Sequence, residues 1–179
     1  MKYRNEQGFS LAELLMVVAI ILVVAAIVFP RLLRSRIAAG EASAASSIRI
    51  INKAEIAYQS AYPTIGFAGS LETLGPGAPE SVCRAPDSRY ACLMDSALSN
   101  ATSSSQAVGG YWFQLTPTSK DASGVVAGYV VSGVAAVYNE TGVRDFCSVE
   151  DGVTHFQVPA SQSRPVGLGP DCTAMPVLH

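Results

Sequence analysis

Few side chains in this 179-residue chain could do catalytic chemistry. The two histidines are His155 and His179, and the sequence has no glycine-rich phosphate loop and no pair of histidines at the spacing of metal ligands. His155 falls in an expected strand, where a structural role is favoured over that of a general base. Because no nucleophile, base and orienting group come together, we expect no catalytic residue, no enzymatic activity and no cofactor.

Three carboxylates, Asp145, Glu150 and Asp151, lie near one expected turn. Carboxylate oxygens at a turn can hold calcium, but a solvated turn is the favoured interpretation. We therefore assign no metal site.

The four cysteines are Cys83, Cys92, Cys147 and Cys172. All follow an apolar segment long enough to cross a membrane, so we expect them outside the cytoplasm, where an even number indicates disulfides. Three pairings are possible. We favour Cys83 with Cys92, which closes a short loop, and Cys147 with Cys172, which fastens the C-terminal tail to a strand. Zinc is the alternative, but the sequence has no C-x-x-C motif to support it.

Residues 9–29 form an apolar run that only Ser10 and Glu13 interrupt. At about 1.5 Å rise per residue, a helix of this length is about 30 Å long, which matches the hydrocarbon thickness of a bilayer. A carboxylate inside such a helix costs roughly 2.5 to 3.5 kcal/mol near the bilayer centre, so Glu13 needs a compensating partner. The alternative is that Glu13 lies close enough to the membrane edge for its side chain to reach water.

Residues 8–14 read GFSLAEL, follow a short basic leader and precede an apolar helix that ends at Pro30. This arrangement resembles the class III signal of type IV pilins and type II secretion pseudopilins. The resemblance implies that a prepilin peptidase and N-methyltransferase cuts after Gly8 and methylates the new amino terminus at Phe9. It also implies that Glu13 pairs with the Phe9 amine of a neighbouring subunit during assembly, and that the helix loosens near Pro30.

The leader carries Lys2 and Arg4 against one acid, Glu6, which favours a cytoplasmic N-terminus by the positive-inside rule. Three arginines directly after Pro30 oppose that count, but the resemblance outweighs them because the leader must face the cytoplasmic peptidase. We therefore expect a single-pass precursor in the inner membrane, with everything after Pro30 outside the cytoplasm.

The first third of the chain is expected to be one long helix behind a short leader. Residues 1–8 are the leader, and residues 9–30 the transmembrane or filament-core helix. Over residues 31–61 the apolar positions recur at spacings of three, four and seven, which predicts an amphipathic continuation of that helix. These positions are Leu33, Ile37, Ala44, Ile48, Ile51 and Tyr58.

The remainder is expected to form a loop, a sheet and a tail. Residues 62–109 are rich in glycine, proline, serine and alanine and predict a connecting loop, with short helices near 70–74 and 92–99. Residues 110–158 predict an antiparallel sheet of three or four strands, at 110–116, 125–131 continuing towards 138, 143–149 and 153–158. Residues 159–179 are the C-terminal tail. The expected fold is α+β and type IV pilin-like, with the long helix packed on a small antiparallel sheet.

These features favour a structural subunit of a type IV pilus-like extracellular filament, a homopolymer that an inner-membrane assembly platform builds from precursors held in the membrane. The alternative within the resemblance is a type II secretion pseudopilin in a short periplasmic filament for protein export. The remote alternative is a membrane-anchored domain that forms no filament. Charged residues are only 15% of the chain and the net charge is −2, so nucleic acid is not indicated as a partner.

Overall fold

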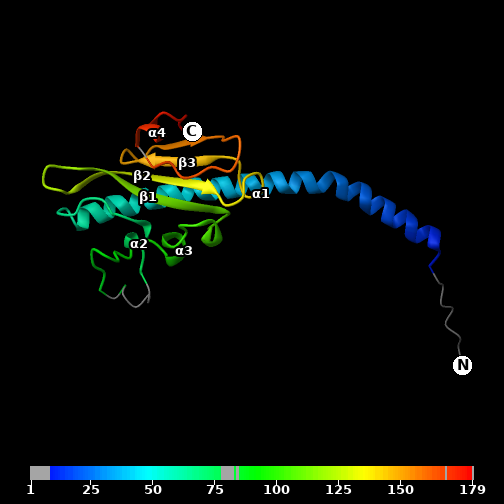
Figure 1. Ribbon diagram of the computed structural model, residues 1–179. Helices are drawn as coiled ribbons and strands as arrows, with labels where there is room; N and C mark the ends of the chain where they lie inside the picture. Colours follow the sequence, from blue (N-terminus) through cyan, green and yellow to red (C-terminus); the bar gives the residue numbers. More distant parts are fainter. Residues whose placement is uncertain (1–8, 78–82, 84, 168, 179) are drawn as a thin grey trace, which may run out of the picture. The chain divides into compact units, whose positions relative to one another are not determined.

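The computed structural model describes residues 9–77, 83, 85–167 and 169–178 (Figure 1). A 51-residue helix, α1 (Leu11–Ala61), precedes a four-stranded antiparallel sheet. The expected α+β, pilin-like fold is thereby confirmed. The chain divides into two units, one that ends at Arg36 and one that begins at Ile37.

The first unit contains the apolar part of α1. Its sequence is almost entirely leucine, isoleucine, valine and alanine up to Phe29. A helix pairs nearly all of its backbone N–H and C=O groups within the segment, which is what an apolar environment requires. The segment is helical on both sides of Pro30, although a proline has no N–H with which to bond the carbonyl four residues earlier.

In the second unit, α1 packs on the sheet through one face. Ala44, Ile48, Ile51 and Tyr58 recur at helical spacing and are each at most 2% exposed. They contact an aromatic core whose members from the strands are Tyr111, Phe113, Tyr129 and Phe146.

Two positions predicted for the apolar face do not reach this core. Leu33 lies in the first unit and is 58% exposed, and Ile37 is only half-buried. The helix residues of the core cluster begin at Ala44. The apolar repeat therefore begins earlier along the helix, at Leu33, than the buried face does, at Ala44.

The sheet has the order β1-β2-β3-β4, and each neighbouring pair is antiparallel. The strands are β1 (Tyr111–Lys120), β2 (Val126–Ala135), β3 (Asp145–Val149) and β4 (Thr154–Gln157). β1 continues through Pro117, past its predicted end at residue 116. β1 is an edge strand, and Pro117 has the same orientation on it as Phe113. The Phe113 N–H points away from β2 and donates to the Ala101 carbonyl. A proline at position 117, which has no N–H, therefore removes no hydrogen bond to β2.

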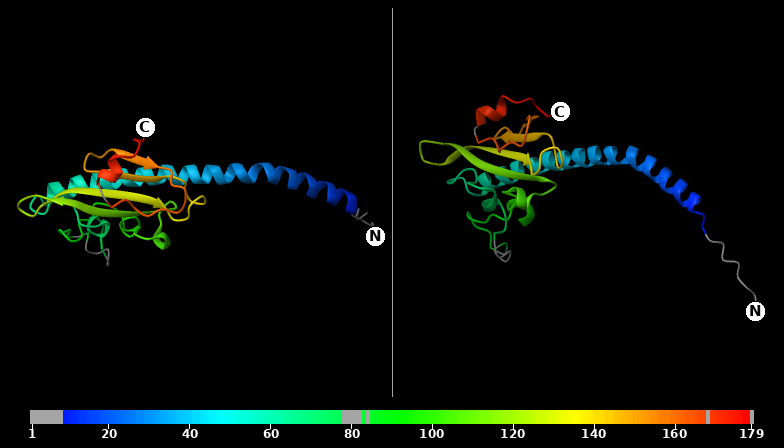
Figure 2. Two further views of the ribbon diagram at one scale, coloured as in Figure 1. Left: turned by 45° about the horizontal axis from the view of Figure 1, so that its top comes forward. Right: turned by 45° about the vertical axis from the view of Figure 1, so that its right-hand side comes forward.

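Both faces of the sheet are covered, because successive strand residues point to opposite sides. On β3, Ser148 faces α1 and accepts a hydrogen bond from Asn52 Nδ2 at 2.9 Å. Cys147 and Val149 face the other way and pack with Cys172 of the tail in a separate apolar cluster. Helix α4 (Gly169–Thr173), which contains Cys172, therefore lies on the side of the sheet opposite α1 (Figure 2).

The described part of the connecting segment includes the short helices α2 (Leu71–Leu74), α3 (Ser96–Ser99) and η2 (Ser104–Gln106). The helix predicted near 92–99 is wrong in its first half. Cys92 has a positive φ of 54°, which interrupts a right-handed helix. Asp95 then caps α3 by accepting the Leu98 N–H at 2.8 Å, so the helix begins only at Ser96.

The two disulfides join the pairs that the sequence favours, Cys83 with Cys92 and Cys147 with Cys172. The second bond ties the tail to β3. The tail also pairs with β4: the Phe156 N–H donates to the Pro176 carbonyl at 2.9 Å, and the Leu178 N–H donates to the Thr154 carbonyl at 2.8 Å. The tail thus covers one edge of the sheet as well as one face.

Candidate functional site

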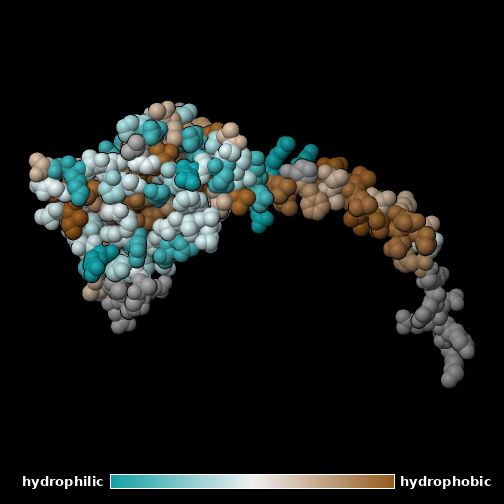
Figure 3. Space-filling view, in the orientation of Figure 1, coloured by the Kyte–Doolittle hydropathy of each residue, from teal (hydrophilic) through white to brown (hydrophobic). Residues whose placement is uncertain are grey.

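The apolar run of α1 is exposed along its whole length. Its large apolar side chains from Phe9 to Phe29 are between 44% and 83% exposed, and Figure 3 shows them as a continuous hydrophobic stretch. By length and composition this part of α1 could cross a membrane. So much exposed apolar surface indicates burial in lipid or against other protein.

The start of α1 is a reciprocal pair of hydrogen bonds between Ser10 and Glu13. Glu13 Oε2 accepts the Ser10 N–H at 3.0 Å, while Ser10 Oγ accepts the Ala12 N–H at 3.3 Å. The arrangement is close to a capping box, in which the side chains at the first cap position and three residues later satisfy free N–H groups of the first turn. The S-x-x-E pattern of Ser10 and Glu13 is the signal in the sequence from which this helix start could be predicted.

Of the residues predicted for processing and assembly, the structure describes some and not others. Gly8 lies outside the described residues. Phe9 precedes the helix and is 83% exposed. The Glu13 carboxylate binds the N–H of Ser10 in its own chain, and its pairing with the Phe9 amine of another subunit remains a prediction.

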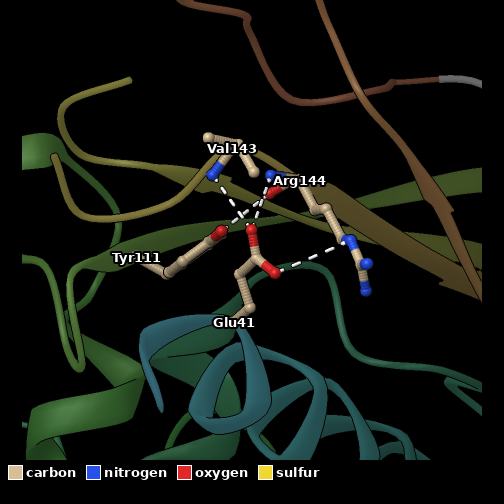
Figure 4. A network of polar contacts seen from close by, with 4 residues as sticks. All are labelled: Glu41, Tyr111, Val143 and Arg144. Atoms are coloured by element: carbon tan, nitrogen blue, oxygen red, sulfur yellow. Dashed lines mark hydrogen bonds and ion pairs between the residues drawn. The ribbon is translucent and has the colours of Figure 1, made fainter. Parts of the chain in front are cut away.

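Further along α1, Glu41 fastens the helix to the segment before β3 (Figure 4). Glu41 Oε1 accepts the N–H groups of Val143 and Arg144 at 3.1 and 3.2 Å, and Oε2 lies 3.6 Å from Arg144 Nε. The Tyr111 hydroxyl donates to the Arg144 carbonyl at 2.8 Å. Burial first, and then the nearby Glu41, raises the pKa of Tyr111, so its hydroxyl stays protonated and can donate.

A small residue beside Glu41 allows this contact. A side chain at Gly40 would come within 2.7 Å of the Thr141 carbonyl oxygen and 3.1 Å of the Gly109 carbonyl oxygen. The backbones therefore approach more closely here than a methyl group permits. The run of small residues in the middle of α1 allows this approach at Gly40.

Replacing Glu41 with alanine is expected to lower the free energy of unfolding of the second unit by about 1 to 3 kcal/mol, because two backbone N–H groups lose their acceptor. Urea unfolding of the full chain in detergent micelles measures this change. The control is Glu140→Ala, which removes an exposed acid from the loop that leads to the same segment. Equal stability of the Glu41 and Glu140 variants would contradict the role given to Glu41.

The three carboxylates expected near one turn do not come together. Asp145 starts β3, is 2% exposed and accepts a hydrogen bond from Gln157 Nε2 at 3.3 Å. Glu150 and Asp151 follow the other end of β3 and are exposed. A five-residue strand separates the two places, so the single-cluster interpretation was wrong.

The described part of the chain contains no group of three or more histidine, cysteine, aspartate or glutamate side chains that could hold a metal. His155 is 6% exposed, and its Nδ1 lies 2.8 Å from the Met175 carbonyl oxygen, so its ring joins β4 to the tail. A shallow surface pocket of about 340 Å³ is lined by serine and threonine hydroxyls with Glu72 and Arg89, and it contains neither histidine nor cysteine.

Comparison with known proteins identifies the N-terminal segment. Residues 3–29 match the family model described as the prokaryotic N-terminal methylation motif. No curated protein and no solved structure matches the chain significantly. The matched residues include the Gly8–Phe9 junction, Glu13 and the exposed apolar helix. The chain therefore carries the class III prepilin signal, and that signal supports a type IV pilin- or pseudopilin-like protein.

Proposed function

We propose that the protein is the pilin subunit of a type IV pilus-like extracellular filament. The observation that carries the proposal is the methylation motif on an apolar helical segment whose large side chains, from Phe9 to Phe29, are all exposed. The second unit buries its own core and covers both faces of its sheet. The second unit exposes only scattered large apolar side chains, whereas the first unit exposes a continuous run of them, and this run is the surface that needs to be covered.

Assembly would follow from the physics of this helix. Burying a leucine, isoleucine or valine side chain stabilises by about 1.5 to 3 kcal/mol relative to water, so the helix stays in the membrane until equivalent helices replace the lipid. Contacts that join one face of a subunit to a different face of the next produce a helical polymer when the rotation between neighbours does not close into a ring. In such a polymer, Glu13 of one subunit would pair with the Phe9 amine of the next.

A type II secretion pseudopilin shares the same signal and the same helix. The two disulfides, the long connecting segment and a mature chain of 171 residues favour the pilin. Negative-stain electron microscopy of the native organism, with an antibody against the second unit, tests the choice. We expect labelled filaments at the cell surface and none after deletion of the gene. Labelling confined to the envelope, with no surface filaments, would contradict the pilin proposal.

Replacing Gly8 with leucine is expected to block processing, because the proposed cut falls directly after a residue without a side chain. The unprocessed subunit would keep its leader, remain in the membrane and form no filaments. Mass spectrometry of the membrane fraction detects the leader, and Gln7→Leu is the matched control one residue away. Normal processing of the Gly8→Leu variant would show that the junction has been misplaced.

A further inference from the structure

Glu55 is a carboxyl group inside the core of the second unit. It lies on α1 between Ile51 and Tyr58, and the residue is 0% exposed. Its Oε2 accepts the N–H of Ala68 at 2.8 Å. Its Oε1 is buried and has no hydrogen-bond partner among the described residues. A buried polar atom in this condition is costly, so its presence needs an explanation.

The polar side chains near Glu55 form hydrogen bonds with other groups and not with Glu55 Oε1. Asn52, one turn earlier on α1, donates to Ser148 Oγ at 2.9 Å and accepts the Tyr129 hydroxyl at 3.0 Å. The Tyr58 hydroxyl donates to the Ser88 carbonyl at 2.7 Å. None of these groups offers a hydrogen bond to Glu55 Oε1.

Among the described residues, no cation appears as a cause of the pKa shift of Glu55, so none compensates a charge there. The titratable groups that respond to Glu55 are the phenols of Tyr58 on α1 and Tyr129 on β2. The groups that act on these phenols in turn are another phenol and three acids: Tyr62, Asp87, Glu150 and Asp151. The ion pair formed by the described residues, Glu41 with Arg144, involves other side chains.

Glu55 is connected through Ala68 to the start of β2. Residues 65–68, which we call the strap, lie next to Val126: the Val126 N–H donates to the Ile65 carbonyl at 2.9 Å, and the Phe67 N–H donates to the Val126 carbonyl at 3.1 Å. Gly66 has a φ of 87°, and any side chain there would collide with the Val126 carbonyl oxygen. The strap therefore links α1, through Glu55, to the β1–β2 hairpin.

We propose that Glu55 is a proton-operated latch. With its proton bound, the carboxyl group is neutral and holds the strap on α1 through the Ala68 N–H. When the proton leaves to solvent, the described part of the chain offers the carboxylate a single N–H donor and no cation, so water can reach it only if the strap moves away. Acidic and neutral pH then keep the strap and the hairpin in place, and alkaline pH releases them.

The direction of the pH dependence follows from the environment. Burial raises the pKa of Glu55 from 4.5 to about 8, and the hydrogen bond from Ala68 offsets only part of that increase. Because the folded state binds this proton more tightly than the unfolded state, the stability it contributes is complete below pH 4.5 and is lost as the pH rises towards 8. The difference between these two pKa values corresponds to a fall of about 3,000-fold in the folding equilibrium constant.

The first test compares urea unfolding of the full chain in detergent micelles at pH 5 and pH 9. For the unmodified chain we expect the folding constant to fall by roughly 700-fold from the Glu55 proton alone. Glu55→Gln, which keeps the shape of the protonated carboxyl group, should remove this fall, and Glu72→Gln on the exposed surface of α2 should not. Identical pH profiles for the unmodified chain and Glu55→Gln would overturn the proposal.

The second test needs no variant to fold. Carbon NMR of the labelled glutamate carboxyl groups should show one that titrates near pH 8, and a Glu55 midpoint below pH 6 would overturn the proposal. Amide hydrogen exchange, corrected for its intrinsic pH dependence, should show that Phe67, Ala68 and Val126 lose protection above pH 8 before Val131 of the central sheet does. Loss of protection at the same pH in all four residues would overturn the latch.

Discussion

Replacing Glu13 with glutamine is expected to abolish surface filaments while the subunit remains in the membrane. Glutamine keeps an acceptor for the Ser10 N–H and therefore preserves the start of α1, but it cannot form an ion pair with the Phe9 amine. Each subunit would then bring an uncompensated amine into an apolar helix bundle, where an unpaired charge costs several kcal/mol. Electron microscopy of the cells measures the surface filaments, and an immunoblot of the membrane fraction measures the amount of subunit in the membrane.

Two further variants separate charge from helix capping. Glu13→Ala removes both the ion pair and the cap and should also prevent filament formation. Glu72→Ala, which removes an exposed acid from α2, should leave the filaments normal. Normal filaments from Glu13→Gln would exclude the ion pair as the basis of assembly, and a loss of filaments in Glu13→Ala alone would point to the helix cap instead.

Removing the disulfide between Cys147 and Cys172 is expected to destabilise the second unit more than removing the one between Cys83 and Cys92. The two bonds span 25 and 9 residues of sequence. Loop-closure entropy then gives losses of about 3.5 and about 2.7 kcal/mol. Cys172 is also 0% exposed and lies in the cluster that covers one face of the sheet, so its loss disturbs packing as well.

Paired serine substitutions test this order. Urea unfolding of Cys147→Ser with Cys172→Ser should show the larger loss of stability, and Cys83→Ser with Cys92→Ser the smaller one. Hydrogen exchange at Phe156 should rise only in the first pair, because its N–H bonds to the tail. A larger loss from the Cys83 and Cys92 pair would contradict this account of how the tail is held.

The elements that local patterns control could be predicted from the sequence. The long helix follows from an apolar run and then a helical repeat, and Ala44, Ile48, Ile51 and Tyr58 are buried as that repeat requires. The favoured disulfide pairs follow from loop size and from the position of the tail. The start of α3 could also be predicted from the sequence, since aspartate is a common N-terminal capping residue and Asp95 caps this helix.

The contacts that depend on distant partners could not be predicted in this way. Glu41 meets Arg144 across 103 residues, and no local pattern connects them. Glu55 stands four residues after Ile51 and three before Tyr58, so it lies on the buried stripe of α1. A search that considered only apolar residues could not find it; the search would also have to include polar residues at the core-facing positions of the helical repeat. β1 was predicted too short because Pro117 usually ends a strand, whereas an edge strand tolerates it.

We propose that this chain is processed after Gly8 and polymerises through its exposed apolar helix. The most direct test is to shear filaments from the native organism and to determine the N-terminal residue and mass of their main subunit. We predict an N-terminus at Phe9 with one added methyl group. A subunit that begins at Met1, or filaments that lack this chain, would contradict the account.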